Sequence, residues 1–180
     1  KGHERMPVRG PDAAITVAGA VSGWHLAHEL SKSLGGAQHP KTLLAEAVAH
    51  AKNGISVTRS QARLTALHHD ALAAAPGFAD VFLPEGKPPA IGDTIHQPRL
   101  ADTLDQLAHA GFMDFYRGDV GKALADDLER IGSPVTREDL VRHEARFRAP
   151  LSVALADATV YNAPPPTQGL ASLLILGIFE

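Results

Sequence analysis

The sequence predicts a mostly helical α+β chain, and three observations lead to this fold class. Apolar residues recur at three- and four-residue spacing in several segments that end at Gly or Pro, as in amphipathic helices. Two short apolar segments near the C-terminal end are typical of a β-hairpin. Hydrophobic residues make up 44% of the 180 residues and charged residues 21%, a balance typical of proteins that bury a core. The length corresponds to one ordinary domain or to part of a larger one.

The first two helices are predicted from stripes of apolar residues. One stripe covers residues 21–34 and stops at the Gly-Gly pair that follows it. The other covers residues 43–51, with Pro40 near its start, where a proline is tolerated. Gly54 stands where a left-handed C-terminal cap is expected, so it should end the second helix.

A third helix and a loop are predicted next. Thr58 and Gln61 have the spacing of a capping box, in which each side chain satisfies the other's free backbone N–H, and the helix then continues to Ala75. Prolines and glycines between residues 78 and 93 predict a loop, with one brief strand at residues 81–83.

Two amphipathic helices follow this loop. Pro98 suits the first position of a helix that stops at Gly111. A stripe over residues 120–128 predicts another helix, which ends near Gly132.

A short helix and the hairpin come next. Thr136 and Asp139 mark the start of a helix that runs to about His143. Residues 151–155 and 159–161 have strand composition and are joined by a tight turn, which predicts the hairpin.

The chain closes on a predicted buried helix. The triple proline 164–166 forces an extended entry, Thr167 can cap, and the run that begins at Leu170 is apolar and broken only by Ser172 and Gly177. We expect the sequence to be cut off within this helix at Glu180. We also expect a processed or truncated start, because Lys1 is no initiator Met and no signal-peptide pattern follows it.

Composition excludes several classes of function. The net charge of −3, from 17 basic and 20 acidic residues, gives no field that would recruit nucleic acid or an anionic membrane. The sequence has no cysteine, which excludes disulfides, zinc-thiolate sites and thiol nucleophiles. The longest apolar run, residues 170–179, is shorter than the roughly 18 residues of a membrane span. We therefore expect neither a nucleic-acid nor a membrane partner.

Two histidine clusters invite a metal hypothesis. His25 and His28 share a helix face with Glu29 beside them, but H-E-x-x-H or H-x-x-E-H spacing is missing. His68 and His69 are adjacent and point about 100° apart on a helix, so they cannot hold one ion together without a third ligand. A solvated helix face is the favoured interpretation of the second cluster, which Asp70 extends, and no metal site is predicted at either cluster.

Other candidate chemistry is equally weak. The carboxylate pairs Asp126-Asp127 and Glu138-Asp139 are interpreted as surface charge, and Asp139 already has a capping role. The glycines of residues 19–23 complete neither G-x-G-x-x-G nor a P-loop, so no nucleotide or other cofactor is expected. No serine stands in a G-x-S-x-G elbow. Spacing alone reveals no catalytic centre.

Seven segments, taken in order, resemble the large-subunit region of the gamma-glutamyltranspeptidase family. They cover the chain from about Gly10 to Glu180, and their order makes the match specific. The segments are Thr16 to Trp24 (T-V-P-G-x-x-x-G-W in the family), Leu43 to Val57 (A-I-x-x-A-x-x-G-F/I-x-V), Gly92 to Leu104 (G-D-x-x-x-Q-x-x-L-A-x-T-L), Phe115 to Gly118 (F-Y-x-G), Val135 to Leu140 (I-T-x-E-D-L), Arg148 to Leu151 (R-x-P-L) and Pro164 to Gly169 (P-P-P-S-S-G-G).

The resemblance implies an N-terminal nucleophile hydrolase with an αββα sandwich, of which this chain is the mostly helical large-subunit part with a β-hairpin. Residues 1–180 would then form part of a single domain with no internal boundary. Such proteins cut themselves into a large and a small subunit, and the freed N-terminal Thr of the small subunit attacks an amide carbonyl with its own α-amine as base. The expected partners are that small subunit and a small amide substrate, with no cofactor.

The family's catalytic residues do not map onto this chain. Its nucleophile and oxyanion glycines belong to the small subunit, and its substrate-carboxylate Arg lies in an F-R-E-x-A-P context that neither Arg5 nor Arg9 has. We therefore predict no catalytic residue here and leave the substrate-binding residues open.

Departures from the family pattern indicate a divergent member. Ala18 and Glu46 replace usual prolines, and Thr167-Gln168 replaces the S-S of the last segment. Glutamyl transfer and hydrolysis of another acid-bearing amide, as in oxamate amidohydrolase-like enzymes or cephalosporin and glutaryl acylases, are both consistent with this. A non-catalytic helical scaffold is the competing class. Localisation stays open, since transpeptidases of the family are commonly exported and oxamate-type relatives work inside the cell.

Overall fold

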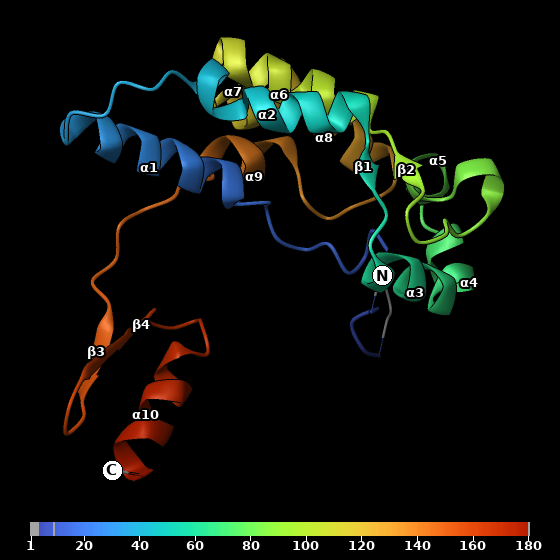
Figure 1. The fold of residues 1–180 in the computed structure, drawn as a ribbon. Coiled ribbons are helices and arrows are strands. Elements are labelled where there is room, and N and C mark those ends of the chain that lie inside the picture. Colours follow the sequence, from blue (N-terminus) through green and yellow to red (C-terminus); the bar gives the residue numbers. More distant parts are fainter. Residues whose placement is uncertain (1–3, 9, 180) are drawn as a thin grey trace. The chain divides into compact units, whose positions relative to one another are not determined.

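The chain forms two compact units in the computed structural model, residues 1–144 and residues 145–180 (Figure 1). The structure describes residues 4–8 and 10–179. The expectation that both units belong to one domain of the complete protein stays a prediction.

The first unit contains helices joined by short connections and one two-stranded pair. In chain order its elements are α1 (Ala20–Ser33), α2 (Pro40–Asn53), β1 (Ile55–Ser56), α3 (Arg59–Leu67), α4 (His69–Ala73), α5 (Phe78–Phe82), a 3-10 turn (Pro84–Gly86), β2 (Thr94–Ile95), α6 (Pro98–Ala110), α7 (Asp114–Arg117), α8 (Asp119–Arg130) and α9 (Arg137–Arg142).

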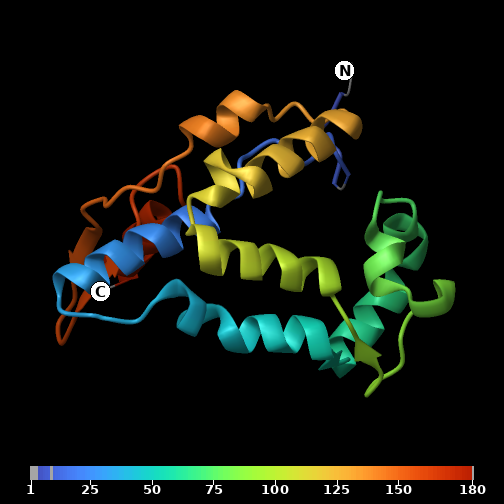
Figure 2. The ribbon, with the colours of Figure 1, turned by 90° about the horizontal axis from the view of Figure 1, so that it is seen from above.

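Helices α2 and α6 lie side by side in opposite directions, and the β1–β2 pair joins their ends (Figure 2). In that pair Ile55 faces Ile95, and the Ile95 side chain is buried. Gly54 ends α2 with φ 90° and Gly111 ends α6 with φ 91°, a backbone conformation that side chains oppose and glycine permits. The two predicted helix ends are confirmed.

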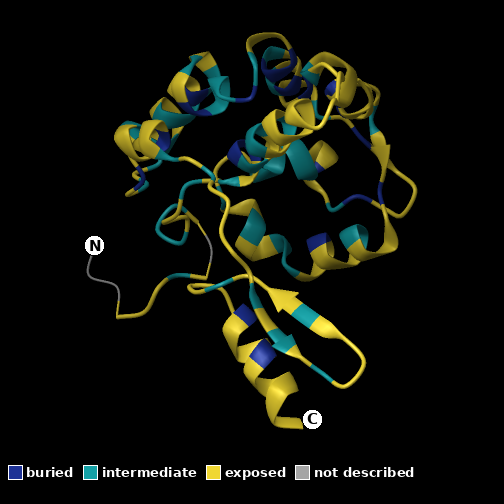
Figure 3. Cartoon of the chain, turned by 90° about the vertical axis from the view of Figure 1, so that its left-hand side faces the viewer, coloured by how far each residue is buried: buried dark blue, intermediate teal, exposed yellow. Residues whose placement is uncertain are grey.

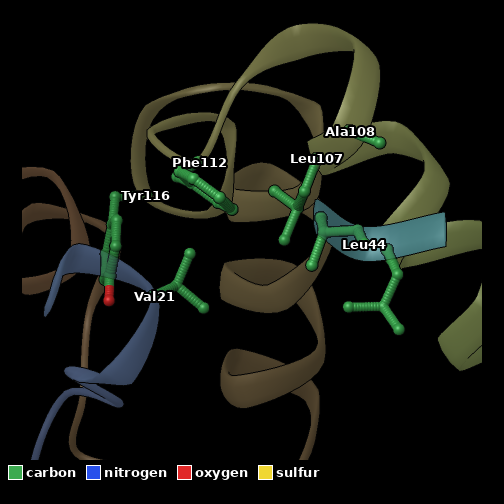
Figure 4. Packing of buried hydrophobic residues seen from close by; sticks show 7 residues of the cluster. Val21, Leu44, Leu107, Ala108, Phe112 and Tyr116 are labelled. Carbon is green, nitrogen blue, oxygen red and sulfur yellow. The ribbon is translucent and has the colours of Figure 1, made fainter. Parts of the chain in front are cut away.

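The main hydrophobic cluster joins α1, α2 and the segment from α6 to α7 (Figure 4). Tyr116 is 0% exposed and Leu107 is 1% exposed, so they are the best-covered large side chains of the cluster. Its buried members are Val21, Leu44, Leu104, Leu107, Ala108, Phe112 and Tyr116.

The third predicted helix is shorter than expected. Thr58 caps it as predicted, since its hydroxyl oxygen accepts the Gln61 N–H at 3.2 Å, but within the described chain the reciprocal half of the capping box is not formed. The helix then breaks at His68, which separates α3 from α4. Thr65 is the one buried residue among the described residues of these two helices, so little tertiary packing holds them in one line.

The loop at residues 78–93 contains a helical turn where a strand was expected. The prediction of a strand at residues 81–83 was wrong, because Phe78–Phe82 form α5. The rings of Phe78 and Phe82 lie 5.0 Å apart, a contact that the i, i+4 spacing of a helix provides. The strands β1 and β2 and the short α7 were not predicted.

The second unit consists of a β-hairpin and one helix. Strands β3 (Leu151–Ala154) and β4 (Thr159–Asn162) pair antiparallel with Val153 opposite Val160, as predicted. Helix α10 (Gly169–Phe179) follows, and the Gly169 N–H donates to the Thr167 hydroxyl oxygen at 3.2 Å.

Helix α10 is largely exposed within the chain, contrary to the expected buried helix (Figure 3). Leu173 is buried, whereas Leu174 is 56% exposed and Ile178 is 77% exposed. The hairpin is the one element that packs on this helix in its unit, and two strands cannot cover all sides of an apolar helix. Among the described helices, none is long and apolar enough to cross a bilayer.

Candidate functional site

A buried polar centre is built around Tyr116 in α7. Its buried hydroxyl accepts the N–H of Ser22 at 3.0 Å and donates to the carbonyl of Ala18 at 2.7 Å. Burial raises the pKa of Tyr116, and the hydrogen bond from the Ser22 backbone opposes this in part. The hydroxyl therefore stays protonated and ties α7 to the start of α1.

Arg137 of α9 completes this centre from the other side. Its guanidinium donates to the carbonyl of Tyr116 at 3.0 Å and to that of Arg117 at 3.2 Å. Thr136 and Asp139 fix the start of α9 through a full capping box. The two hydrogen bonds that Thr136 donates hold the pKa of Asp139 below its usual range. The Arg137 hydrogen bonds therefore hold the segment Phe115 to Gly118 against the segment Val135 to Leu140.

His143 packs against this centre. Its ring lies 5.2 Å from the ring of Tyr116, and its Nε2 atom is buried without a hydrogen-bond partner in the described part of the chain. A Cβ atom at Gly19 would lie 3.1 Å from that Nε2. A side chain at position 19, just before α1, would therefore require the His143 ring to shift by a few tenths of an ångström.

The His25, His28 and Glu29 cluster lies on a groove beside α1, here called the α1 groove. Two adjoining cavities of about 420 and 400 Å³ form it, and both are lined by His28, Gln38 and Phe112. The His28 side chain is 10% exposed, and its Nε2 lies 2.9 Å from the Gln38 carbonyl oxygen. Because a carbonyl only accepts, Nε2 carries the proton, and Nδ1 is left as an acceptor in neutral His28.

Glu29 is engaged with a neighbouring ammonium group. Lys32 Nζ donates to its carboxylate at 2.7 Å, and this contact is the main reason that the pKa of Glu29 lies below its usual range. Within residues 4–8 and 10–179, no three His, Asp or Glu side chains come together in a way that could hold a metal ion.

The remaining candidates have structural or surface positions. His69 contacts the exposed Asp70 at 3.0 Å, and Asp127 pairs with Arg130 in the next turn of α8. Asp126 and Glu138 line an open cavity of about 590 Å³ between α8 and α9. These carboxylates do not form a close buried pair of the kind that separates acid from base.

The two arginines set aside from the substrate-carboxylate role add nothing to this picture. Arg5 is exposed, and Arg9 lies outside the described residues. The sequence did not predict that Tyr116 and Arg137 join α1, α7 and α9 through hydrogen bonds. The F-Y-x-G segment was the available signal, since it pairs a tyrosine with a glycine at a turn.

The model of the family described as gamma-glutamyltranspeptidase matches residues 1–180. The chain belongs to the gamma-glutamyltranspeptidase family. Six of the seven segments that carried the resemblance lie at the Tyr116 centre, in the α2–α6 pair or at the entry to α10, and the seventh, Arg148 to Leu151, leads into β3.

Named relatives agree with this assignment. The chain is 46% identical over 180 residues to the oxamate amidohydrolase proenzyme of Klebsiella pneumoniae, covering 99% of the chain and 34% of that protein. It is 37% identical to the glutathione hydrolase-like YwrD proenzyme of Bacillus subtilis, covering 100% of the chain and 34% of that protein. The chain thus spans about a third of the length of these relatives.

Solved structures confirm the predicted fold class. A cephalosporin acylase from Bacillus halodurans aligns with TM-score 0.83 and 28% identity, over 95% of this chain and 32% of that one. A gamma-glutamyltranspeptidase from Pseudomonas nitroreducens aligns with TM-score 0.76 and 32% identity, over 90% of this chain and 46% of that one. These neighbours are N-terminal nucleophile hydrolases, and this chain has the fold of the corresponding part.

Proposed function

We propose that this chain is the large-subunit region of a self-processing amidase whose N-terminal Thr nucleophile lies in a small subunit outside the 180 residues. The observation that carries the proposal is the family match over every residue combined with a span of 34% of the two named proenzymes. Both relatives are named proenzymes, which supports maturation by cleavage.

The second unit supports a partner of this kind. Its helix α10 has no charged residue between Gly169 and Phe179, and Leu174, Ile175 and Ile178 are all more than half exposed. A hairpin of two strands is marginal by itself and becomes stable when further strands or helices cover it. The small subunit would supply that cover, and its strands would extend the hairpin.

In this proposal the small subunit carries the reacting groups, and this chain supplies the helical framework around them. In the proposed mechanism the Thr hydroxyl attacks the amide carbonyl, its α-amine takes the proton, and backbone N–H groups stabilise the oxyanion. The leaving amine departs with the proton, and water releases the acyl group. The Tyr116 centre and the α2–α6 pair keep the large subunit rigid around that site.

Hydrolysis of a small acid-bearing amide is the first candidate reaction. The 46% identity to an oxamate amidohydrolase proenzyme extends over nearly the whole chain and favours this substrate class. Gamma-glutamyl transfer or hydrolysis is the second candidate. It is favoured by the family model and by the 37% identity to a glutathione hydrolase-like proenzyme.

The test is an intact-mass spectrum of the complete protein under denaturing conditions, followed by two activity assays. We expect two polypeptides, of which the second begins with Thr. We also expect ammonia release from oxamate to exceed release of the aniline from a gamma-glutamyl anilide. The reverse ratio would support the second candidate, and a single uncut species with neither activity would leave the non-catalytic scaffold as the correct interpretation.

A further inference from the structure

The α1 groove has the size and composition of a small-molecule site that the proposed amidase chemistry does not use. Its two cavities, of about 420 and 400 Å³, each lie within the range of ligand pockets. Because His28, Gln38 and Phe112 line both, the cavities adjoin one another.

One cavity, here called the apolar cavity, is walled by aromatic and aliphatic side chains. The Trp24 and Phe112 rings meet edge to face with centroids 6.3 Å apart, and Leu43 and Leu44 line the opposite side. Trp24 is 46% exposed and Leu43 is 51% exposed, while Phe112 is 5% exposed. The floor is therefore fixed by the core, and the walls present uncovered apolar surface that a ligand can bury.

The other cavity, here called the polar cavity, is rich in nitrogen groups. His25, His28, Lys32 and His39 line it, against the single carboxylate of Glu29. His39 Nδ1 accepts the N–H of Lys41 at 3.2 Å, so its other ring nitrogen carries a proton and can donate. Lys32 and Glu29 pair with each other, so their charges balance, and the groups that an anion can use are the remaining N–H donors of Lys32 and the donor nitrogen of His39.

We propose that the α1 groove binds a small amphipathic carboxylate, with its apolar tail beside Trp24 and Leu43 and its carboxylate beside Lys32. His28 lies between the polar and the apolar cavity. Its ring is held there because it packs edge to face on Phe112 at 5.8 Å and contacts the Gln38 carbonyl oxygen. The tail gains contact with the half-exposed indole, and the head group shares Lys32 with Glu29.

The experiment uses the complete protein labelled with 5-fluorotryptophan, with 2-naphthoate as the probe. The Trp24 resonance is assigned by loss of its ¹⁹F signal in Trp24→Phe. We expect that signal to shift saturably, with a dissociation constant on the order of 1 mM for a ligand of this size. The neutral 2-naphthalenemethanol should bind roughly threefold more weakly, as expected when an exposed ion pair is lost.

Variants separate the two halves of the groove. Leu43→Glu places a charge in the apolar cavity and should abolish the shift, whereas Leu67→Glu, at a 67% exposed position on α3, should leave it unchanged. Glu29→Gln releases Lys32 and should tighten naphthoate binding about threefold, while Lys32→Gln should weaken it about threefold. Neither of these two variants should change binding of the neutral alcohol.

Three results would overturn the proposal. One is a Trp24 signal that does not respond to naphthoate, which is also the result expected if another segment of the complete protein fills the groove. Another is an unchanged affinity in Leu43→Glu. The third is equal affinity in Glu29→Gln and Lys32→Gln, both of which change exposed side chains and so keep the test valid if Leu43→Glu fails to fold.

Discussion

Replacing Tyr116 by Phe tests whether the hydroxyl, rather than the ring, joins α7 to α1. The ring remains, so the packing of the 0% exposed side chain is kept. The change removes the bond from Ser22 N–H at 3.0 Å and the bond to the Ala18 carbonyl at 2.7 Å. Each such bond contributes about 1 kcal/mol, so we expect a loss of about 2 kcal/mol.

Urea denaturation of the complete protein, followed by circular dichroism, gives the free energy of unfolding. Tyr161→Phe is the matched control, since Tyr161 is 64% exposed and the same oxygen is removed. We expect the control to change stability by less than about 0.5 kcal/mol. Hydrogen exchange of the Ser22 amide gives a local measure, and it should accelerate in Tyr116→Phe alone.

The same substitution has a pH signature. Because burial raises the pKa of Tyr116, the unfolded chain releases this proton first, near its ordinary value of about 10. Stability from this group is present below that pH and is lost as pH rises toward the raised folded value. Tyr116→Phe should remove this alkaline loss. Equal stability of the Tyr116→Phe and Tyr161→Phe proteins, with equal alkaline slopes, would refute the role given to the hydroxyl.

Three further predictions concern helix ends and the second unit. Gly111→Ala should cost about 1–2 kcal/mol from its positive φ alone, and Gly54→Ala about 2 kcal/mol more, because the new Cβ meets a side chain of β2. Because the pKa of Asp139 is lowered in the folded chain, the capping box of α9 should be stable above pH about 4, and the start of α9 should fray as the pH falls through that lowered pKa. Asp139→Asn should remove this pH dependence of amide hydrogen exchange in α9. Leu174→Glu should reduce recovery of the assembled complete protein, because α10 needs an apolar cover.

Each of these has a control within the chain. Urea midpoints compare Gly54→Ala with the double variant that also carries Thr94→Ser, which removes the nearest obstructing methyl group and should recover part of the added cost, since the His96 ring also lies 3.0 Å from the new Cβ. Exchange in α6, whose start has no side-chain cap, should not follow the same acid profile. Gel filtration compares Leu174→Glu with Leu67→Glu, since Leu67 is 67% exposed, against 56% for Leu174, and lies outside the second unit. Indistinguishable results within a pair would contradict the corresponding prediction.

Most helices could be predicted from residues at their own ends, whereas β1, β2 and α7 depend on contacts that form only in the folded chain. Pro40, Gly54, Pro98 and Gly111 fix the ends of α2 and α6 by backbone preferences that act within a few residues. Strands β1 and β2 have two residues each and exist because α2 and α6 bring their ends together, a contact between residues 38 to 40 positions apart that no local pattern reveals. The same holds for the turn of α7, which Asp114 and the core position of Tyr116 stabilise.

The candidate site was harder to predict, because polar residues of this chain serve the framework. Asp139 has a sequence position that suits acid–base chemistry, and the structure shows it capping α9. Tyr116 carries a role that depends on Ser22, 94 positions earlier in the chain, so only the folded chain displays it. The family segments were the one route from sequence to function, since their order records contacts that spacing does not.

The contacts made and left open by the described residues support the proposal that the nucleophile lies outside this chain. In the first unit, Tyr116, Arg137 and Asp139 are engaged in hydrogen bonds that hold helix ends together, which leaves them ill suited to exchange protons with a substrate. In the second unit the uncovered surface is apolar, along α10, and apolar surface binds partners rather than reacting. A partner subunit that covers α10 and carries the nucleophile would account for both facts. In that arrangement the first unit of this chain would supply a rigid framework, and the second would supply the apolar surface on which the partner packs.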